Sequence, residues 1–107
     1  MKTLILLLTF FLFFSLNAQD MKKKEIWIDV RTIEEFNSGH IEGALHIPYE
    51  TIGNEISKHV KDKNATIKVY CKVGGRAGIA KKTLDKMGYK KVINAGGYKK
   101  ILKDMEK

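Results

Sequence analysis

The sequence predicts an α/β fold in which a parallel sheet of about four strands carries helices on both faces. Short apolar, strand-like runs alternate with helix-like segments along the chain, in the order βαβαβαβα. The segments between successive strands are long enough for the crossover helices that parallel strands require. The 107 residues have room for one domain. Ligands of such sheets bind beyond the carboxyl ends of the strands.

A signal peptide is predicted at residues 1–18. The apolar run at residues 4–16 is shorter than the roughly 20 residues of a membrane span, and the small Ala18 marks a cleavage site. An uncleaved N-terminal anchor is the alternative. A basic linker is predicted at residues 19–24 and the folded domain at residues 25–107. We therefore expect a periplasmic or secreted protein.

The first half of the domain begins with a strand, expected in the largely apolar segment EIWIDV (25–30) and ending at Asp29. One or two helical turns follow, because Thr32 is a suitable N-cap, Glu35 completes a capping box and Gly39 ends the helix. A second, short strand is expected at residues 44–47, directly before the only proline of the chain.

The second half continues the alternation. A helix is expected where three apolar residues recur at four-residue steps: Ile52, Ile56 and Val60. After the third strand, another helix has four apolar residues near one face and ends at a glycine signal: Ala77, Ala80, Leu84 and Met87, then Gly88. A last strand with a turn at Gly96 and Gly97 leads into a terminal helix over residues 98–107.

Cys71 is the only cysteine in the chain and directly follows the third predicted strand. It therefore lies at the carboxyl end of the sheet, where ligands of parallel sheets bind. No internal disulfide is possible, and a lone thiol in an exported protein is exposed to oxidation. Either Cys71 is buried and inert, packed as a small hydrophobic residue, or it is the reactive group of the protein.

The loop after Cys71 has the composition of an anion-binding site. Gly74 and Gly75 permit a tight curl in which successive backbone N–H groups point inward, next to the positive end of the following helix. Lys72 and Arg76 add two positive charges. All of these groups favour a thiolate over a thiol. A thiolate that faces such a loop is suited to attack an anionic sulfur or phosphorus centre.

Five segments resemble landmarks of the single-domain rhodaneses, in that family's order: IDVR (28–31), EEF (34–36), GHIEGALHIP (39–48), VYCKVGGRAG (69–78) and GYKKVINAGG (88–97). The resemblance implies a three-layer rhodanese-like fold and a thiosulfate sulfurtransferase that needs no cofactor. It implies that Cys71 takes the outer sulfur of thiosulfate, releases sulfite and holds a persulfide. Cyanide or a thiol would then accept the sulfur.

The resemblance also implies which residues bind the substrate. The backbone amides of residues 72–76 would surround the persulfide and the sulfonate, and Arg76 with Lys72 would orient the dianion. The predicted substrate-binding residues are therefore Lys72, Val73, Gly74, Gly75 and Arg76.

The loop leaves alternatives open. Four residues separate Cys71 from Arg76, one fewer than in the related phosphatases, so the loop favours sulfur over a phosphate-ester hydrolase. Many rhodanese loops have Ser or Thr after the arginine, and Ala77 lacks that hydroxyl. The tryptophan common after the last Gly-Gly is absent, with Tyr98 near its place. A persulfide carrier or interaction module with low turnover is therefore the second hypothesis.

The remaining features bear on other classes of function. A formal net charge of +8 favours an anionic small substrate or surface, but the lysines are scattered, so no nucleic acid partner is expected. His46 and His59 have no partners at metal-ligand spacing, so no metal site is expected. Asp29 with Arg31, and His40, are expected to have structural roles. We expect a monomer without stable membrane association after cleavage.

Overall fold

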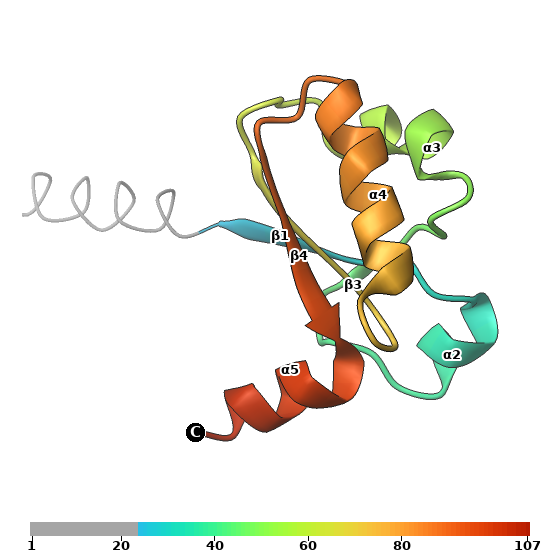
Figure 1. The fold of residues 1–107 in the computed structure, drawn as a ribbon, viewed down its shortest axis with the longest axis vertical. Helices are drawn as coiled ribbons and strands as arrows, with labels where there is room; N and C mark the ends of the chain where they lie inside the picture. The colour runs from blue at the N-terminus through green and yellow to red at the C-terminus, as the bar shows by residue number, and fades with distance from the viewer. Residues whose placement is uncertain (1–23) are drawn as a thin grey trace, which may run out of the picture.

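The computed structural model describes residues 24–107, which form four strands and four helices (Figure 1). In chain order they are β1 Glu25–Asp29, α2 Ile33–Asn37, β2 Leu45–His46, α3 Ile52–His59, β3 Thr66–Cys71, α4 Gly75–Lys86, β4 Lys91–Gly97 and α5 Tyr98–Met105. The predicted α/β fold and its alternating order are confirmed. The predicted signal peptide, residues 1–18, and nearly all of the predicted linker lie outside the described residues.

The four strands form one parallel sheet in the order β2-β1-β3-β4. β1 pairs with β3 from Glu25 opposite Thr66 to Asp29 opposite Tyr70. Because every neighbouring pair is parallel, the carboxyl ends of all strands meet at one edge of the sheet. The sheet therefore delivers Cys71, the last residue of β3, to the edge where α2 and the loop before α4 lie (Figure 1).

Helices cover both faces of the sheet, as predicted. Figure 1 shows α3 and α4 on one side of the strands and α5 on the other. The larger core lies between the sheet, α3 and α4, and its fully buried members include Ile28, Val69, Ile56 and Leu84. Each such side chain contributes about 1.5–3 kcal/mol when it leaves water, so this face supplies most of the hydrophobic stabilisation.

The apolar stripes predicted for α3 and α4 are buried with one exception. Six of the seven residues lie in the larger core: Ile52, Ile56, Val60, Ala77, Ala80 and Leu84. Met87 is the C-cap of α4 and is 36% exposed. It therefore lies at the margin of this core rather than inside it.

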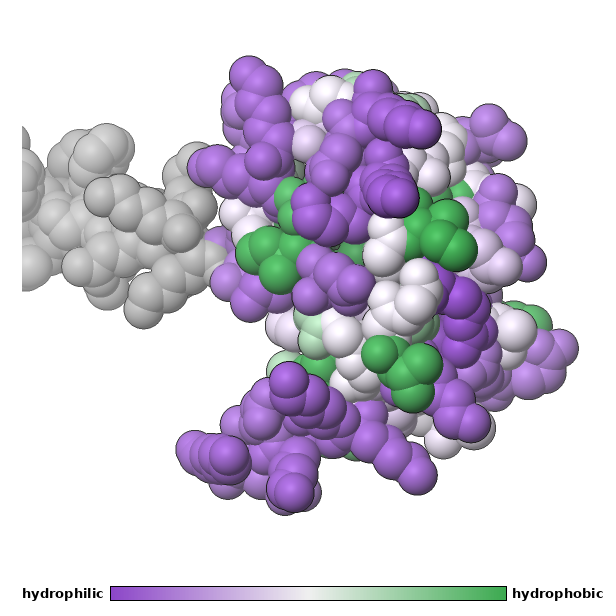
Figure 2. All heavy atoms as spheres, in the orientation of Figure 1, coloured by the Kyte–Doolittle hydropathy of each residue, from purple (hydrophilic) through white to green (hydrophobic). Residues whose placement is uncertain are grey.

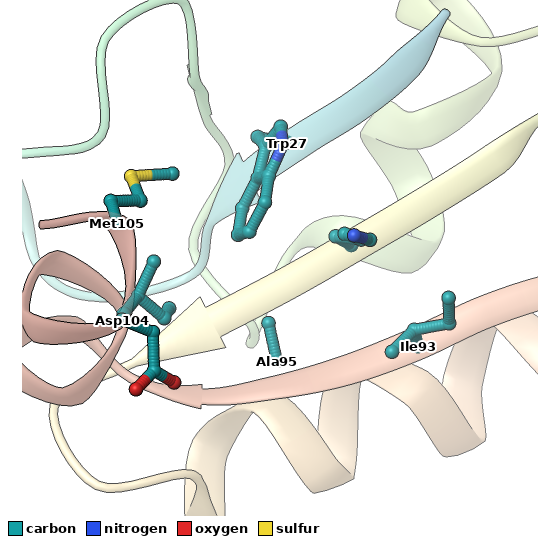
Figure 3. Close-up of a pocket in the computed structure, with 7 residues that line it drawn as sticks. Trp27, Ile93, Ala95, Asp104 and Met105 are labelled. Carbon is teal, nitrogen blue, oxygen red and sulfur yellow. The ribbon is translucent and has the colours of Figure 1, made fainter. Parts of the chain in front are cut away.

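A smaller core under α5 is built on Tyr70, whose ring Trp27 contacts edge-on with 6.2 Å between centroids. Beside this core lies a recess of about 320 Å³, whose lining includes Trp27, Ile93 and Met105 (Figure 3). Neighbouring residues of a strand point to opposite faces of the sheet. Tyr70 and Cys71 are neighbours in β3, so the recess beside Tyr70 is on the other side of the sheet from the Cys71 side chain.

Hydrophilic side chains cover much of the molecular face in Figure 2, including the region over α5. The hydrophobic residues on this face lie in small separate patches, which is normal for the surface of a monomeric protein. Within residues 24–107, no helix is long and apolar enough to cross a membrane. The monomeric state stays a prediction.

Candidate active site

Cys71 ends β3, and its side chain lies on the face of the sheet that α4 covers. It is part of the larger core, together with Ala77 and Ala80, and is 1% exposed. Burial alone fits the alternative of an inert cysteine. The hydrogen bonds to its sulfur argue against that alternative.

Two backbone N–H groups donate to the sulfur of Cys71. The nitrogen of Gly74 lies 2.9 Å from Sγ, and the nitrogen of Ala77 lies 3.4 Å from it. A sulfur that accepts N–H bonds holds negative charge better than one surrounded only by apolar groups. Cys71 is therefore not packed only as a small hydrophobic residue, and its role as a nucleophile stays a prediction.

The loop curls around the sulfur because of its glycines. Gly74 has φ +108° and ψ −14°, a left-handed conformation that residues with side chains rarely adopt. α4 then begins at Gly75, so the positive N-terminal end of the helix lies next to the sulfur. Ala77, in the first turn of α4, provides the second N–H donor to Sγ.

Asn94 of β4 fastens the loop from the side. Its Nδ2 donates to the carbonyl oxygen of Gly74 at 3.0 Å, and its Oδ1 accepts from the N–H of Gly96 at 2.9 Å. The same Gly74 carbonyl accepts from the N–H of Gly78 at 3.0 Å. The residue whose N–H contacts the sulfur is thus held by both β4 and α4.

The prediction that Gly96 and Gly97 form a turn is wrong, because both lie in β4. They pair with Tyr70 and Cys71 at the end of the ladder, after a bulge. A Cβ at Gly97 would lie only 2.4 Å from the carbonyl oxygen of Lys72. Glycine is required here so that the backbone of β4 can pass the loop at close range.

Arg76, in the first turn of α4, reaches α2 and binds Glu35. Its Nη1 and Nη2 donate to the two carboxylate oxygens of Glu35 at 2.7 and 3.0 Å. These bonds lower the pKa of the Glu35 carboxyl to about 2 and raise the pKa of Arg76. Glu35 was expected only as a capping residue, and its capping box with Thr32 is confirmed. Orientation of a dianion by Arg76 stays a prediction.

A recess of about 560 Å³ opens beside the loop. Its lining comes from α2, the loop and the start of α5, and includes Glu35, Lys72, Val73 and Lys99. Among the ion pairs of residues 24–107, none uses Lys72 or Lys99. The entrance to the loop therefore carries positive charge that no carboxylate of this part of the chain neutralises.

Asp29, Arg31 and His40 make the internal contacts expected of structural residues, and Arg31 also lines the recess. Nη2 and Nε of Arg31 donate to the buried carboxylate of Asp29 at 2.7 and 2.9 Å, and Nη2 also donates to the Gly39 carbonyl at 2.7 Å. The bond to Asp29 raises the pKa of Arg31. His40 stacks on the ring of Phe36, and its Nδ1 donates to the Phe36 carbonyl at 2.9 Å.

The elements from β1 through most of α5 fall within one known family pattern. A family model described as a rhodanese-like domain matches residues 15–104. The chain belongs to the rhodanese-like family. The predicted family and the predicted fold class are thereby confirmed.

This rhodanese-like protein is similar to the thiosulfate sulfurtransferase PspE of Escherichia coli (strain K12), with 48% identity over 77 residues, 72% of this chain and 74% of PspE. YrkF of Bacillus subtilis (strain 168), named as a candidate sulfur carrier protein, is 41% identical over 69 residues, 63% of this chain and 35% of YrkF. The solved structure of a rhodanese with anions from E. coli has a TM-score of 0.69 and 47% identity, covering 71% of this chain and 89% of that one.

Sequence reasoning missed three contacts of this rhodanese-like loop. Asn94 and Gly97 reach it from β4, and Glu35 reaches Arg76 from α2. The available signal for Gly97 was Gly-Gly at the end of a strand, which fits a close backbone approach as well as a turn. No local pattern pointed to Asn94, since its partner Gly74 is 20 residues away in the chain.

Proposed function

We propose that the protein is a sulfurtransferase that takes the outer sulfur of thiosulfate onto Cys71 as a persulfide and passes it to cyanide or a thiol. One observation carries the proposal: the only cysteine holds its sulfur against the N–H groups of Gly74 and Ala77, at the start of α4. Membership of the rhodanese-like family and the similarity to PspE support the same chemistry. The proposed reaction uses no cofactor.

In the first step, the Cys71 thiolate attacks the outer sulfur of thiosulfate. A bond forms between these two sulfur atoms while the S–S bond of thiosulfate breaks, and sulfite leaves with the bonding electron pair. In the second step, cyanide or a thiolate attacks the outer sulfur of the persulfide, and Cys71 leaves as a thiolate. In each step the nucleophile supplies the electron pair of the new bond and the leaving group, sulfite or the Cys71 thiolate, keeps the pair of the broken bond, so the cycle needs no external oxidant or reductant.

The loop supplies the binding groups for this reaction. We expect the backbone N–H groups of residues 72–76 to face the added sulfur and the sulfonate as preorganised donors. Lys72 adds positive charge at the entrance. Arg76 can contribute while it remains bound to Glu35, because a guanidinium has five N–H donors and the pair occupies two of its nitrogens.

Mass spectrometry of the intact protein tests the proposal. Incubation with thiosulfate should add the mass of one sulfur atom to the protein and release an equal amount of sulfite. Cyanide added afterwards should remove the extra mass and form thiocyanate. Cys71→Ala should show neither change, and full activity of that variant would refute the proposal.

A persulfide carrier with low turnover is the second candidate. Ala77 is fully buried and offers its N–H to the sulfur, but it has no hydroxyl that could donate as well. The similarity to YrkF supports this candidate. A protein that forms a stable persulfide once, yet turns over negligibly with thiosulfate and cyanide, would favour it. Ala77→Ser should then raise the turnover rate.

We further propose that the protein works in the periplasm or as a secreted protein. This proposal rests on the signal-peptide pattern of residues 1–18, with cleavage after Ala18. The intact mass of the protein recovered from a bacterial host decides between cleavage and a retained anchor. Gel filtration of the same sample tests the expected monomer.

A further inference from the structure

Glu35 is bonded on two sides. Within α2, its Oε1 accepts from the N–H and the hydroxyl of Thr32 at 3.1 Å each, and its own N–H donates to the Thr32 hydroxyl oxygen at 3.2 Å. Toward α4, its two carboxylate oxygens accept from Arg76 at 2.7 and 3.0 Å. One carboxylate thus joins the start of α2 to the start of α4.

The bond between Glu35 and Arg76 can affect the N–H groups that donate to the Cys71 sulfur. α2 is five residues long and has no buried residue. Among the hydrogen bonds of residues 24–107, those between Glu35 and Arg76 are the ones that join side chains of α2 and α4. Arg76 lies in the chain between Gly74 and Ala77, whose N–H groups donate to Cys71. A shift of the Arg76 backbone would therefore act on both donors, against the hydrogen bonds that Asn94 and Gly78 make to Gly74.

Glu35 also determines how much charge Arg76 presents to an anion. The two side chains are each 28% exposed, so water screens their charges only in part. With the carboxylate in place, the pair is neutral overall, and an incoming anion meets the positive charge of Lys72 and Lys99. Replacing the carboxylate by an amide would leave Arg76 as a full positive charge close to Cys71.

We propose that Glu35 is a positioning residue of the sulfur-transfer site: by holding Arg76, it keeps the N–H groups of Gly74 and Ala77 on the Cys71 sulfur and limits the positive charge beside it. The effect on the rate with thiosulfate rests on the proposed function. The effect on the reactivity of the Cys71 sulfur is independent of the proposed function. Glu35 acts through Arg76 and touches no reacting atom.

Glu35→Gln tests the proposal, with Glu34→Gln as the matched control. Glu34 is the neighbouring residue of α2, is exposed, and forms no ion pair among residues 24–107. In the full chain, Glu35→Gln should slow persulfide formation at saturating thiosulfate about tenfold, because the donors are no longer held in place. The thiosulfate concentration at half-saturation should not rise, because the positive charge of Arg76 is no longer neutralised by Glu35. Glu34→Gln should match the wild type in both quantities.

Alkylation of Cys71 gives a readout that does not depend on sulfur transfer. The ratio of the rate with iodoacetate, an anion, to the rate with neutral iodoacetamide should rise about threefold in Glu35→Gln. If the wild type forms no persulfide with thiosulfate, the proposed function fails, but this ratio still tests Glu35. A ratio and a persulfide rate that both stay within twofold of wild type in Glu35→Gln would overturn the inference.

A double-mutant cycle separates positioning through Arg76 from a general loss of structure. If Glu35 acts through Arg76, then Glu35→Gln should change the alkylation ratio and the persulfide rate little further when Arg76→Gln is already present. Additive effects would contradict the inference. Should Glu35→Gln fail to fold, Arg76→Lys is measured in its place. It keeps the charge but loses the two-point contact, so the persulfide rate should fall, and a wild-type rate would again overturn the inference.

Discussion

Gly97→Ala should displace the loop that holds the sulfur of Cys71. The added Cβ would lie 2.4 Å from the carbonyl oxygen of Lys72 and 3.2 Å from the Cα of Val73. Both neighbours are backbone atoms, so no side-chain rotation relieves the overlap. Real Cβ atoms essentially never come closer than 3.0 Å to such atoms, so β4 and the loop must move apart.

The cost of this separation can be estimated. Overpacking lowers the free energy of unfolding by about 1–3 kcal/mol, and each kcal/mol lowers the Tm of a domain of this size by about 4–8 °C. The effect on the reaction should be larger. Gly74 follows Lys72 by two residues, and its N–H donates to Sγ of Cys71 at 2.9 Å. A misplacement of such a group by about 1 Å can slow a reaction about a hundredfold.

Two assays on the same samples check this prediction. Thermal unfolding followed by circular dichroism gives Tm, and quenched-flow measurement of sulfite release gives the rate of persulfide formation. Gly78→Ala is the matched control, because its added Cβ would meet Nδ2 of Asn94 at an ordinary 3.5 Å, and alanine inside a helix stabilises by up to about 1 kcal/mol. Wild-type Tm and rate in Gly97→Ala, or an equal loss in Gly78→Ala, would refute the reasoning.

Three further predictions concern charged residues. The bonds to Arg76 lower the pKa of Glu35 to about 2 in the folded protein, below its usual 4.5. The Glu35 carboxylate therefore adds about 1 kcal/mol to the free energy of unfolding well above pH 4.5, and this contribution is lost toward pH 2. In urea unfolding, the free energies of Glu35→Gln and wild type should differ at pH 7 and converge near pH 2. Lys99→Ala should raise the half-saturating thiosulfate concentration about two- to fivefold, whereas Lys100→Ala, outside the recess, should leave it unchanged in steady-state kinetics. Asp29→Asn should lower the free energy of unfolding by about 3–5 kcal/mol in urea titrations, because Arg31 keeps a buried charge without its partner.

Those parts of the fold that depend on neighbouring residues could be predicted from the sequence. Ile52, Ile56 and Val60 are buried because a four-residue apolar step places them on one side of a helix. The capping box of Thr32 and Glu35 forms because both partners lie within one helical turn. In the same way, the position of Cys71 at the end of β3 followed from the strand pattern directly before it.

The parts that were missed depend on contacts between distant segments. Glu35 and Arg76 are 41 residues apart in the chain, and nothing in either local sequence indicates the partner. Gly97 was assigned to a turn because glycine permits turns, but here its missing side chain leaves room for Lys72. A glycine signal cannot distinguish these two uses until the neighbouring backbone is known.

The pairing of β1 with β3 determines when the site can form during folding. Partners in this ladder, such as Ile28 and Val69, are separated by about 40 residues, so a long loop must close before the β1–β3 ladder gains any hydrogen bond. Cys71 gains its strand neighbour Gly97 only after β4 joins the sheet. A nascent chain that ends before β4 therefore exposes the backbone edge of β3 and has no completed sulfur site. Folding intermediates of this protein should be prone to association through that edge until the last strand docks.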